Sequence, residues 1–337
     1  MAMTVPYDRI YGALIGQAVG DALGAPTEGM SRDQITSRYG WVEDFVSDDP
    51  AGTDDTEYAV LSARIILQHG HELTLAGVTD AWRDTLLAQE GGFNRGGFSE
   101  MAAIKNISAG LVAPQTGADN HEMWSDGTAM RITPVGVFCA GDPREAARLA
   151  AIDAQVSHAR DGIYCAQAIA AAVAVALVES SWEPVIEAGL GAVPPDSWSA
   201  RTITRAVDIG RRAPGLRAAV DQLYDELSIL CYPWADVAPE ATALAFGVLA
   251  AAGGDYVDAV LAGVNVGRDA DTIAAMAGGM AGALHGAQAV PERWRSRINR
   301  VRGDCITATA GTDLAELAKQ FERALATERD EERNAAR

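Results

Sequence analysis

Helical periodicity of the apolar residues constrains the fold of this chain more than any other feature of its sequence. In residues 56–70, Tyr58, Leu61, Ile65 and Ile66 recur at three- and four-residue steps, the spacing of one face of a helix. The same pattern runs through 75–87, 143–154, 162–178, 239–252, 256–264 and 272–284. Convincing alternating strands are missing. The chain is therefore predicted to be all-α, a single large multi-helix domain.

Small residues are frequent inside these predicted helices. Residues 273–286 read IAAMAGGMAGALHG, and Gly278, Gly279 and Gly282 fall near one face of that helix. Each glycine inside a helix costs about 1 kcal/mol relative to alanine, so three of them need a tertiary reason. Close contact between backbones is the simplest one. We expect this helix to lie deep in the core.

Charge and cysteine usage exclude several classes of function. The 337 residues include 27 Lys and Arg and 46 Asp and Glu, a net charge of −19. Such a chain is a poor partner for nucleic acids or anionic membranes.

The four cysteines show no CxxC spacing. The most apolar stretch, 165–178, is too short to span a bilayer. The start lacks the features of a secretory signal. A cytoplasmic protein, with a monomer favoured, is expected.

The chain shows no composition change that would divide it into domains. We predict one domain over residues 1–326 and a charged, disordered tail over 327–337, where large apolar residues are nearly absent. The Pro-Pro pair within 193–198 and the segment around Pro233 are interpreted as loops.

Two acidic clusters lie more than 200 residues apart. Thr53-Asp54-Asp55-Thr56 precedes a predicted helix, and Asp269-Ala270-Asp271-Thr272 precedes another. Capping a helix start explains one acid in each cluster, but it does not explain the second. In an extended segment, residues two apart project on the same side, so Asp269 and Asp271 can converge.

Taken together, the clusters predict a metal site if their loops face each other. Four carboxylates and several threonine hydroxyls are hard oxygen ligands, which suit Mg²⁺, Mn²⁺ or Ca²⁺ better than zinc. So many unpaired carboxylates would repel one another or take up protons without cations between them. Two divalent ions about 3.5–4 Å apart would meet that need and create a catalytic centre.

A third segment, GALIGQAVGDALGAPTEGM (12–30), begins with a predicted helix that ends at the turn Gly24-Ala25-Pro26. Glu28 follows this turn. Together with TDDT and GRDADT, in this order and at these separations, this third segment resembles the signature of the ADP-ribosylglycohydrolase family. The resemblance covers about residues 8–290. SDGTAMRITPVGVF (125–138) is similar to the family's glycine-rich Met-Arg segment, and VSHARDG (156–162) to its Ser-His region.

The resemblance implies an all-helical enzyme with a binuclear Mg²⁺ or Mn²⁺ site in a cleft. It implies six metal ligands and a set of substrate-lining residues around Glu28, which would lie beside the metals and the reacting water. The implied metal ligands are Thr53, Asp54, Asp55, Asp269, Asp271 and Thr272, and the implied substrate-lining residues are Gly96, Gly97, Asp126, Gly127, Met130 and His158.

The implied reaction is hydrolysis of an N- or O-ribosyl bond of an ADP-ribosyl group on a protein or small acceptor. Such cleavage develops positive charge at the anomeric carbon, and a metal-bound water becomes a competent nucleophile near neutral pH. Glu28, Asp54 or Asp55 would take its proton. Three alternatives stay open at this point: hydrolysis of a smaller N-riboside or nucleotide, an inactive binding or structural protein, and two-metal phosphoester hydrolysis.

One position departs from the expected pattern. Asp126 stands where we expect asparagine in family members, and it would add negative charge to the cleft. An ordinary explanation is that Asp126 caps a turn or faces away from the cleft. The other is that the preferred substrate lacks the ADP diphosphate, which the charge would repel. Arg131, Arg95 and Arg268 are candidates to compensate the negative charge of Asp126.

Overall fold

The computed structural model describes residues 5–89 and 96–335, with side chains as far as Thr327, so Arg95 lies outside it. The described part of the chain is helical and has no β-sheet. Its strand-like pairing is limited to two isolated bridges, Ser125 with Val237 and Arg300 with Asp313. The prediction of an all-α fold is confirmed.

The helices agree closely with the predicted segments. Residues 75–87, predicted as one helix, form α4 followed by a π-helical turn, Arg83–Leu87. The α-helices are α1 (Tyr7–Gly24), α2 (Arg32–Tyr39), α3 (Asp54–His69), α4 (Leu75–Trp82), α5 (Phe98–Ser108), α6 (Gln115–Ala118), α7 (Gly127–Arg131), α8 (Thr133–Phe138), α9 (Pro143–Ala154), α10 (Asp161–Ala176), α11 (Glu183–Gly191), α12 (Trp198–Arg212), α13 (Leu216–Leu227), α14 (Ala238–Ala251), α15 (Tyr256–Val266), α16 (Ala270–His285), α17 (Glu292–Ile298) and α18 (Leu314–Ala335).

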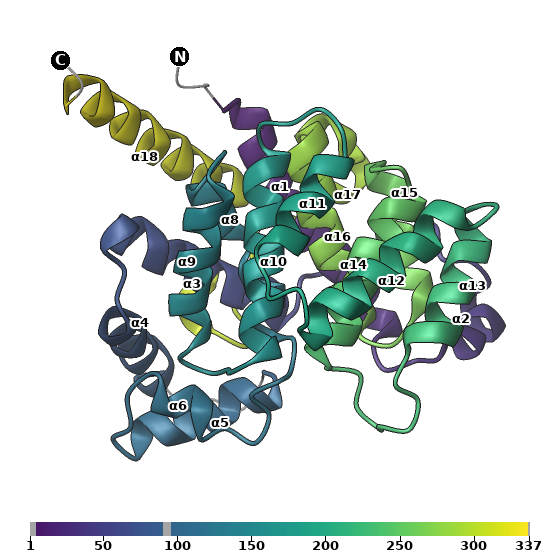
Figure 1. Ribbon diagram of the computed structural model, residues 1–337, viewed down its shortest axis with the longest axis horizontal. Coiled ribbons are helices and arrows are strands. Elements are labelled where there is room, and N and C mark those ends of the chain that lie inside the picture. The colour runs from purple at the N-terminus through teal and green to yellow at the C-terminus, as the bar shows by residue number, and fades with distance from the viewer. Residues whose placement is uncertain (1–4, 90–95, 336–337) are drawn as a thin grey trace.

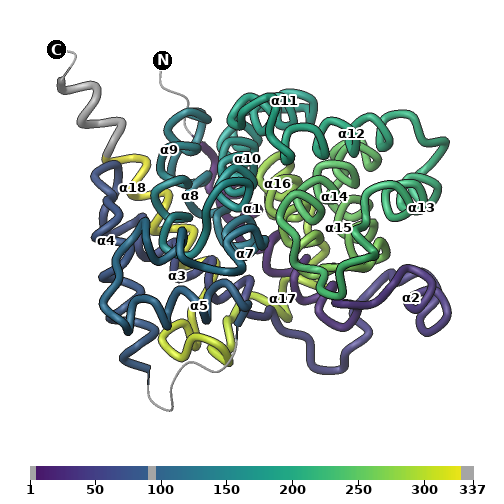
Figure 2. Tube along the Cα trace, turned by 60° about the horizontal axis from the view of Figure 1, so that its bottom comes forward, coloured from purple at the N-terminus to yellow at the C-terminus, as the bar shows by residue number. Residues whose placement is uncertain are grey.

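Helices α1 and α16 form the centre of the molecule and are surrounded by the other helices (Figure 1; Figure 2). Every residue of α16 from Ala270 to Leu284 is buried, which confirms the prediction that this helix lies deep in the core. Helix α10 packs against α16 and also contacts α8, α9, α11 and α14. Helices α12, α13 and α15 complete the side that Figure 1 shows on the right.

Glycines allow the backbones of α1 and α16 to touch. A Cβ atom built on Gly16 would lie 2.5 Å from the carbonyl oxygen of Gly278. Gly12 meets Gly282 and Gly20 meets Ala274 in the same way, each closer than the 3.0 Å that real Cβ atoms keep. The partners run in opposite order along the two helices, so α1 and α16 are antiparallel. The end of α1 therefore lies beside the start of α16.

The C-terminal helix α18 packs against α1 and continues to Ala335. The predicted boundary at residues 326 and 327 falls within this helix, and the division into a domain and a disordered tail stays a prediction. Within the described residues, no helix combines the length and the apolar character that crossing a membrane requires.

We expect Gly16→Ala to destabilise the fold, because its methyl group would meet the backbone carbonyl of Gly278, a clash that no side-chain movement can relieve. Overpacking of this kind costs roughly 1–3 kcal/mol or more of unfolding free energy. Gly191→Ala is the matched control, since a Cβ atom there meets nothing within 4 Å and should stabilise α11 slightly. Urea unfolding measures both, and equal stabilities would contradict the close α1–α16 contact.

Candidate functional site

The antiparallel pair α1 and α16 brings Glu28 to the second acidic cluster. Glu28 follows the 3₁₀ turn Ala25–Thr27 that ends α1, and Asp269 and Asp271 stand at the start of α16. One carboxylate oxygen from each of these three residues lies within 4.8 Å of the others. Residues more than 240 positions apart thus share one small volume.

The first acidic cluster faces the second. Thr53 caps α3 by accepting a hydrogen bond from the Asp55 amide at 3.3 Å. The Thr272 hydroxyl of α16 donates to Oδ2 of Asp55 at 3.0 Å. Asp269 precedes α16 but makes no side-chain capping bond. Capping therefore accounts for Thr53 and leaves the carboxylates for another purpose.

Both clusters open into one cavity of about 540 Å³. It gathers most of the predicted site residues and adds a second wall from the segments near α5 and before α14. Among the predicted residues, those lining it are Glu28, Asp54, Asp55, Gly96, Gly97, Asp126, Gly127, Met130, Asp269, Asp271 and Thr272. The residues that sequence reasoning did not include are Gly29, Phe98, Glu100, Ser125, Pro233, Trp234, Ala235 and Asp236.

His158 and Thr53 lie outside the lining of this cavity. His158 is 1% exposed, with Nε2 3.0 Å from Ser125 Oγ and Nδ1 2.8 Å from Ser157 Oγ. Burial, aided by Arg131, lowers the pKa of His158 well below its usual value, so the ring is neutral. It supports the cavity wall through Ser125, which does line the cavity.

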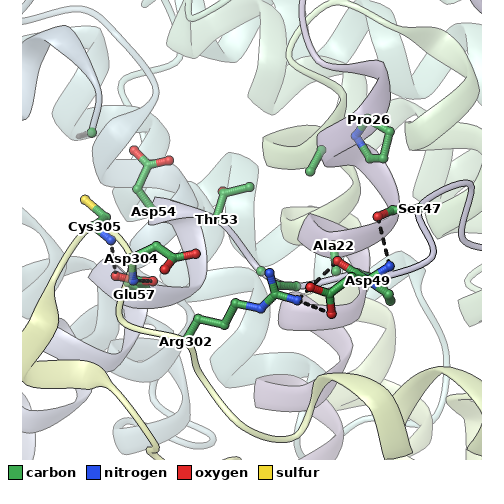
Figure 3. A pocket seen from close by; sticks show the side chains of 15 residues that line it. Ala22, Pro26, Ser47, Asp49, Thr53, Asp54, Glu57, Arg302, Asp304 and Cys305 are labelled. Atoms are coloured by element: carbon green, nitrogen blue, oxygen red, sulfur yellow. Dashed lines mark hydrogen bonds and ion pairs between the residues drawn. The ribbon is translucent and has the colours of Figure 1, made fainter.

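Thr53 lines an adjoining pocket of about 350 Å³, drawn in Figure 3. Asp54 and Gly96 line both spaces. In this pocket Glu57 accepts hydrogen bonds from the amides of residues 304–306, so its carboxylate holds a distant loop in place. Arg302 pairs with Asp49 at 2.5 Å beside it (Figure 3).

The side chain of Glu100 explains why glycine stands at positions 97 and 127. A Cβ atom on Gly97 or Gly127 would lie less than 3.0 Å from the Glu100 carboxylate. Arg131 pairs with Glu100 at 3.2 Å and with Asp153 at 3.0 Å, and all three side chains are buried. These glycines therefore make room for a charged side chain of the protein.

Asp21 is a further residue that sequence reasoning missed. It is fully buried on α1 and accepts hydrogen bonds from the amides of Thr53 and Thr56 and from the Thr56 hydroxyl. These bonds fix the start of α3, where Asp54 and Asp55 stand. An aspartate within an otherwise small and apolar helical segment was the signal that could have indicated it.

The cavity concentrates uncompensated negative charge. Burial, together with neighbouring acids, raises the pKa of Glu28 and Asp54 to about 7 and that of Asp236 to about 6. The pKa values of Asp55, Asp126 and Asp271 rise well above the usual range for the same two reasons. Oδ1 of Asp271, Oδ2 of Asp126 and Oδ1 of Asp236 are buried and have no hydrogen-bond partner among the described residues.

Aromatic side chains stand at the cavity beside this charge. Phe98 and Trp234 are 41% and 51% exposed, with ring centroids 5.0 Å apart in an edge-to-face arrangement. The segment around Pro233, predicted to be a loop, is one in the structure. It carries Trp234 and Asp236 into the cavity wall.

We expect the metal-free protein to lose stability as the pH rises from about 5.5 to about 7.5. Carboxyl groups with raised pKa values bind protons more tightly in the folded state than in the unfolded chain, where the values are near 4. Over this window the folded state therefore holds the extra protons at low pH and gives them up as the pH rises. Calorimetry in EDTA should show Tm falling by at least about 3 °C.

At the upper pH, Mn²⁺ or Mg²⁺ should restore the lost stability, because a cation that binds only the folded state stabilises it. A parallel scan with a monovalent salt at equal ionic strength is the control. A flat or rising Tm in EDTA would contradict the charge density described for the cavity.

Comparison with known proteins agrees with this architecture. A protein of Archaeoglobus fulgidus described as uncharacterized is 34% identical over 299 residues, covering 85% of this chain and 90% of its own. ADP-ribosylarginine hydrolase Tri1 of Pseudomonas putida is 25% identical over 302 residues, covering 86% and 74%. A solved structure titled ADP-ribosylglycohydrolase-related protein complex has the same fold, with a TM-score of 0.67, 24% identity and coverage of 94% and 98%.

The sequence profile of one family matches almost the whole length, residues 3–333. With the helical fold and the facing acidic loops, it shows that the chain belongs to the ADP-ribosylglycohydrolase family of glycoside hydrolases.

Proposed function

We propose that this chain hydrolyses the N- or O-glycosidic bond of an ADP-ribosyl group, using two divalent cations, Mg²⁺ or Mn²⁺, held between the acidic loops. The observation that carries the proposal is the single cavity that gathers Glu28, both acidic clusters and an aromatic pair. The family and the printed name of the Pseudomonas relative support ADP-ribosylated protein as the substrate class. A cytoplasmic, monomeric enzyme is part of the same proposal.

The residues present fit divalent cations. Their donors are carboxylate and hydroxyl oxygens, the ligands that Mg²⁺ and Mn²⁺ prefer. Asp271 presents a buried oxygen without a hydrogen-bond partner, and Thr272 joins the two loops through Asp55. We assign the cations to the predicted ligands Thr53, Asp54, Asp55, Asp269, Asp271 and Thr272. Bound there, they would hold the ribose hydroxyls and lower the pKa of water.

The protein's own residues account for the rest of the reaction. Glu28 is at the edge of the cavity, and its pKa of about 7 lets it exchange a proton near neutral pH. We assign Glu28 the role of accepting a proton from the water that attacks the anomeric carbon. The buried carboxylates facing that carbon favour the positive charge that develops there as the bond breaks.

The remaining lining residues would position the substrate. Gly96, Gly97, Gly127 and Met130 leave space along one wall, and Phe98 and Trp234 offer two exposed rings on which a purine would stack. His158 would act from behind, by holding Ser125. A substrate with both a ribose and a base matches a cavity that joins a carboxylate cluster to an aromatic pair.

A second candidate function is hydrolysis of a smaller N-riboside. No lysine or arginine is among the described residues that line the cavity, so a diphosphate would find no cationic side chain there. Turnover of ADP-ribosylated arginine, ADP-ribosylated serine and simple nucleosides, each with Mg²⁺ or Mn²⁺, distinguishes the two candidates. Hydrolysis of nucleosides alone would replace the first proposal by the second.

We expect Asp55→Ala and Asp271→Ala each to reduce turnover to below about 1% of the parent rate, because each removes a ligand from the metal centre. Both variants should keep the helical circular dichroism spectrum, since the carboxylates belong to the cavity and do not pack in the apolar core. Glu187→Ala, an exposed acid on α11, is the control. Parent-like activity in either site variant would refute the assignment.

We expect Trp234→Ala to raise KM for an ADP-ribosyl substrate about tenfold, with little change in kcat, because base stacking contributes about 1–3 kcal/mol. Trp198→Ala removes a tryptophan of similar exposure, 39%, that does not line the cavity, and it should leave KM unchanged. An equal KM for both variants would remove Trp234 from the binding site. Initial-rate kinetics on ADP-ribosylated arginine give both values.

A further inference from the structure

Asp126 has a buried side chain that the fold does not explain. It is 3% exposed, lines the cavity and directly precedes α7. Its amide donates to the carbonyl oxygen of Asp236 at 3.0 Å, but its side chain makes no capping bond to α7. Oδ2 has no hydrogen-bond partner among the described residues. The explanation that Asp126 caps a turn is therefore wrong.

The arginines on the adjoining segments do not neutralise Asp126. Arg131, on α7, is held by Glu100 and Asp153. Arg268, directly before Asp269, pairs with Glu240 at 2.5 Å. Both guanidinium groups are thus engaged with other carboxylates. A buried carboxylate without a counter-charge is costly, so Asp126 either holds a proton or binds a cation from outside the chain.

The carboxyl group of Asp126 shares the cavity with that of Asp269. Among the neighbouring acids, Asp269 does most to raise the pKa of Asp126. Neighbouring carboxyl groups without a counter-charge are compatible either with bound protons or with a shared cation. Asp269 belongs to the acidic loop assigned to the cations, and the free Oδ2 of Asp126 supplies another hard oxygen in the same cavity.

We propose that Asp126 is a ligand of a divalent cation that it shares with Asp269. This inference rests on the metal centre of the proposed function. The metal centre then takes ligands from three segments, at the starts of α3, α7 and α16. The two acidic clusters alone supply ligands from only two of these segments, at the starts of α3 and α16. The cation also neutralises the charge that Asp126 would otherwise present to a diphosphate, so an anionic substrate remains compatible with this residue.

Calorimetric titration of the intact, substrate-free chain with Mn²⁺ tests the proposal. Asp126→Asn replaces the carboxyl group by a neutral amide of the same shape. Asp236→Asn makes the same replacement in the same cavity, at a residue that also has a buried oxygen without a partner, and serves as the matched control for general electrostatics. We expect Asp126→Asn to weaken Mn²⁺ binding at least about tenfold more than Asp236→Asn does.

A second measurement does not depend on any variant. Anomalous scattering from Mn²⁺-soaked crystals of the parent chain should place an ion against the carboxylates of Asp126 and Asp269. Equal affinity losses in the two variants, parent-like binding by Asp126→Asn, or ions bound away from Asp126 would each overturn the proposal. Absence of Mn²⁺ binding by the parent would overturn it together with the metal centre. Mn²⁺ binding without hydrolysis of ADP-ribosyl substrates would remove only the proposed reaction.

Discussion

The direct contact between the backbones of α1 and α16 determines the rest of the structure. Gly12, Gly16 and Gly20 carry no Cβ atom, so the two helices approach until the carbonyl groups of one meet the Cα atoms of the other. A bulkier interface would push the helices apart along their whole length. Because the helices are antiparallel, the loop that carries Glu28 and the loop that carries Asp269 and Asp271 meet at one end of the pair.

Buried acids in this protein fall into two groups with different partners. Glu100, Asp153 and Glu240 are paired with arginines, and Asp21 accepts bonds from two backbone amides and a hydroxyl. Such groups keep segments in place, because removing one partner would leave a buried charge unpaired. The acids of the cavity have mainly one another as neighbours. Protons held by the groups with raised pKa values lower their cost to the fold, and a bound cation would replace those protons.

The sequence predicted the helices well, because the spacing of apolar residues depends on local geometry alone. It also indicated that the TDDT and GRDADT segments work together, since one acid in each exceeds what a helix start needs. Glu100 and Asp236 were not predicted as site residues, because nothing in the local sequence distinguishes a single acid in a cavity from one in solvent. Trp234 was not predicted for a similar reason: a tryptophan in a loop is assigned to packing until its exposure is known.

The charge of the whole chain bears on how an anionic substrate would reach this site. A net charge of −19 repels a diphosphate at long range, and the described cavity lining contributes no cationic side chain of its own. Divalent cations bound by the cavity acids would change the sign of the local field. In the proposed enzyme the cations therefore serve substrate binding as much as bond cleavage, so metal removal should impair both steps together. A riboside without phosphates would depend on the cations for chemistry and for its ribose, but not for overcoming repulsion.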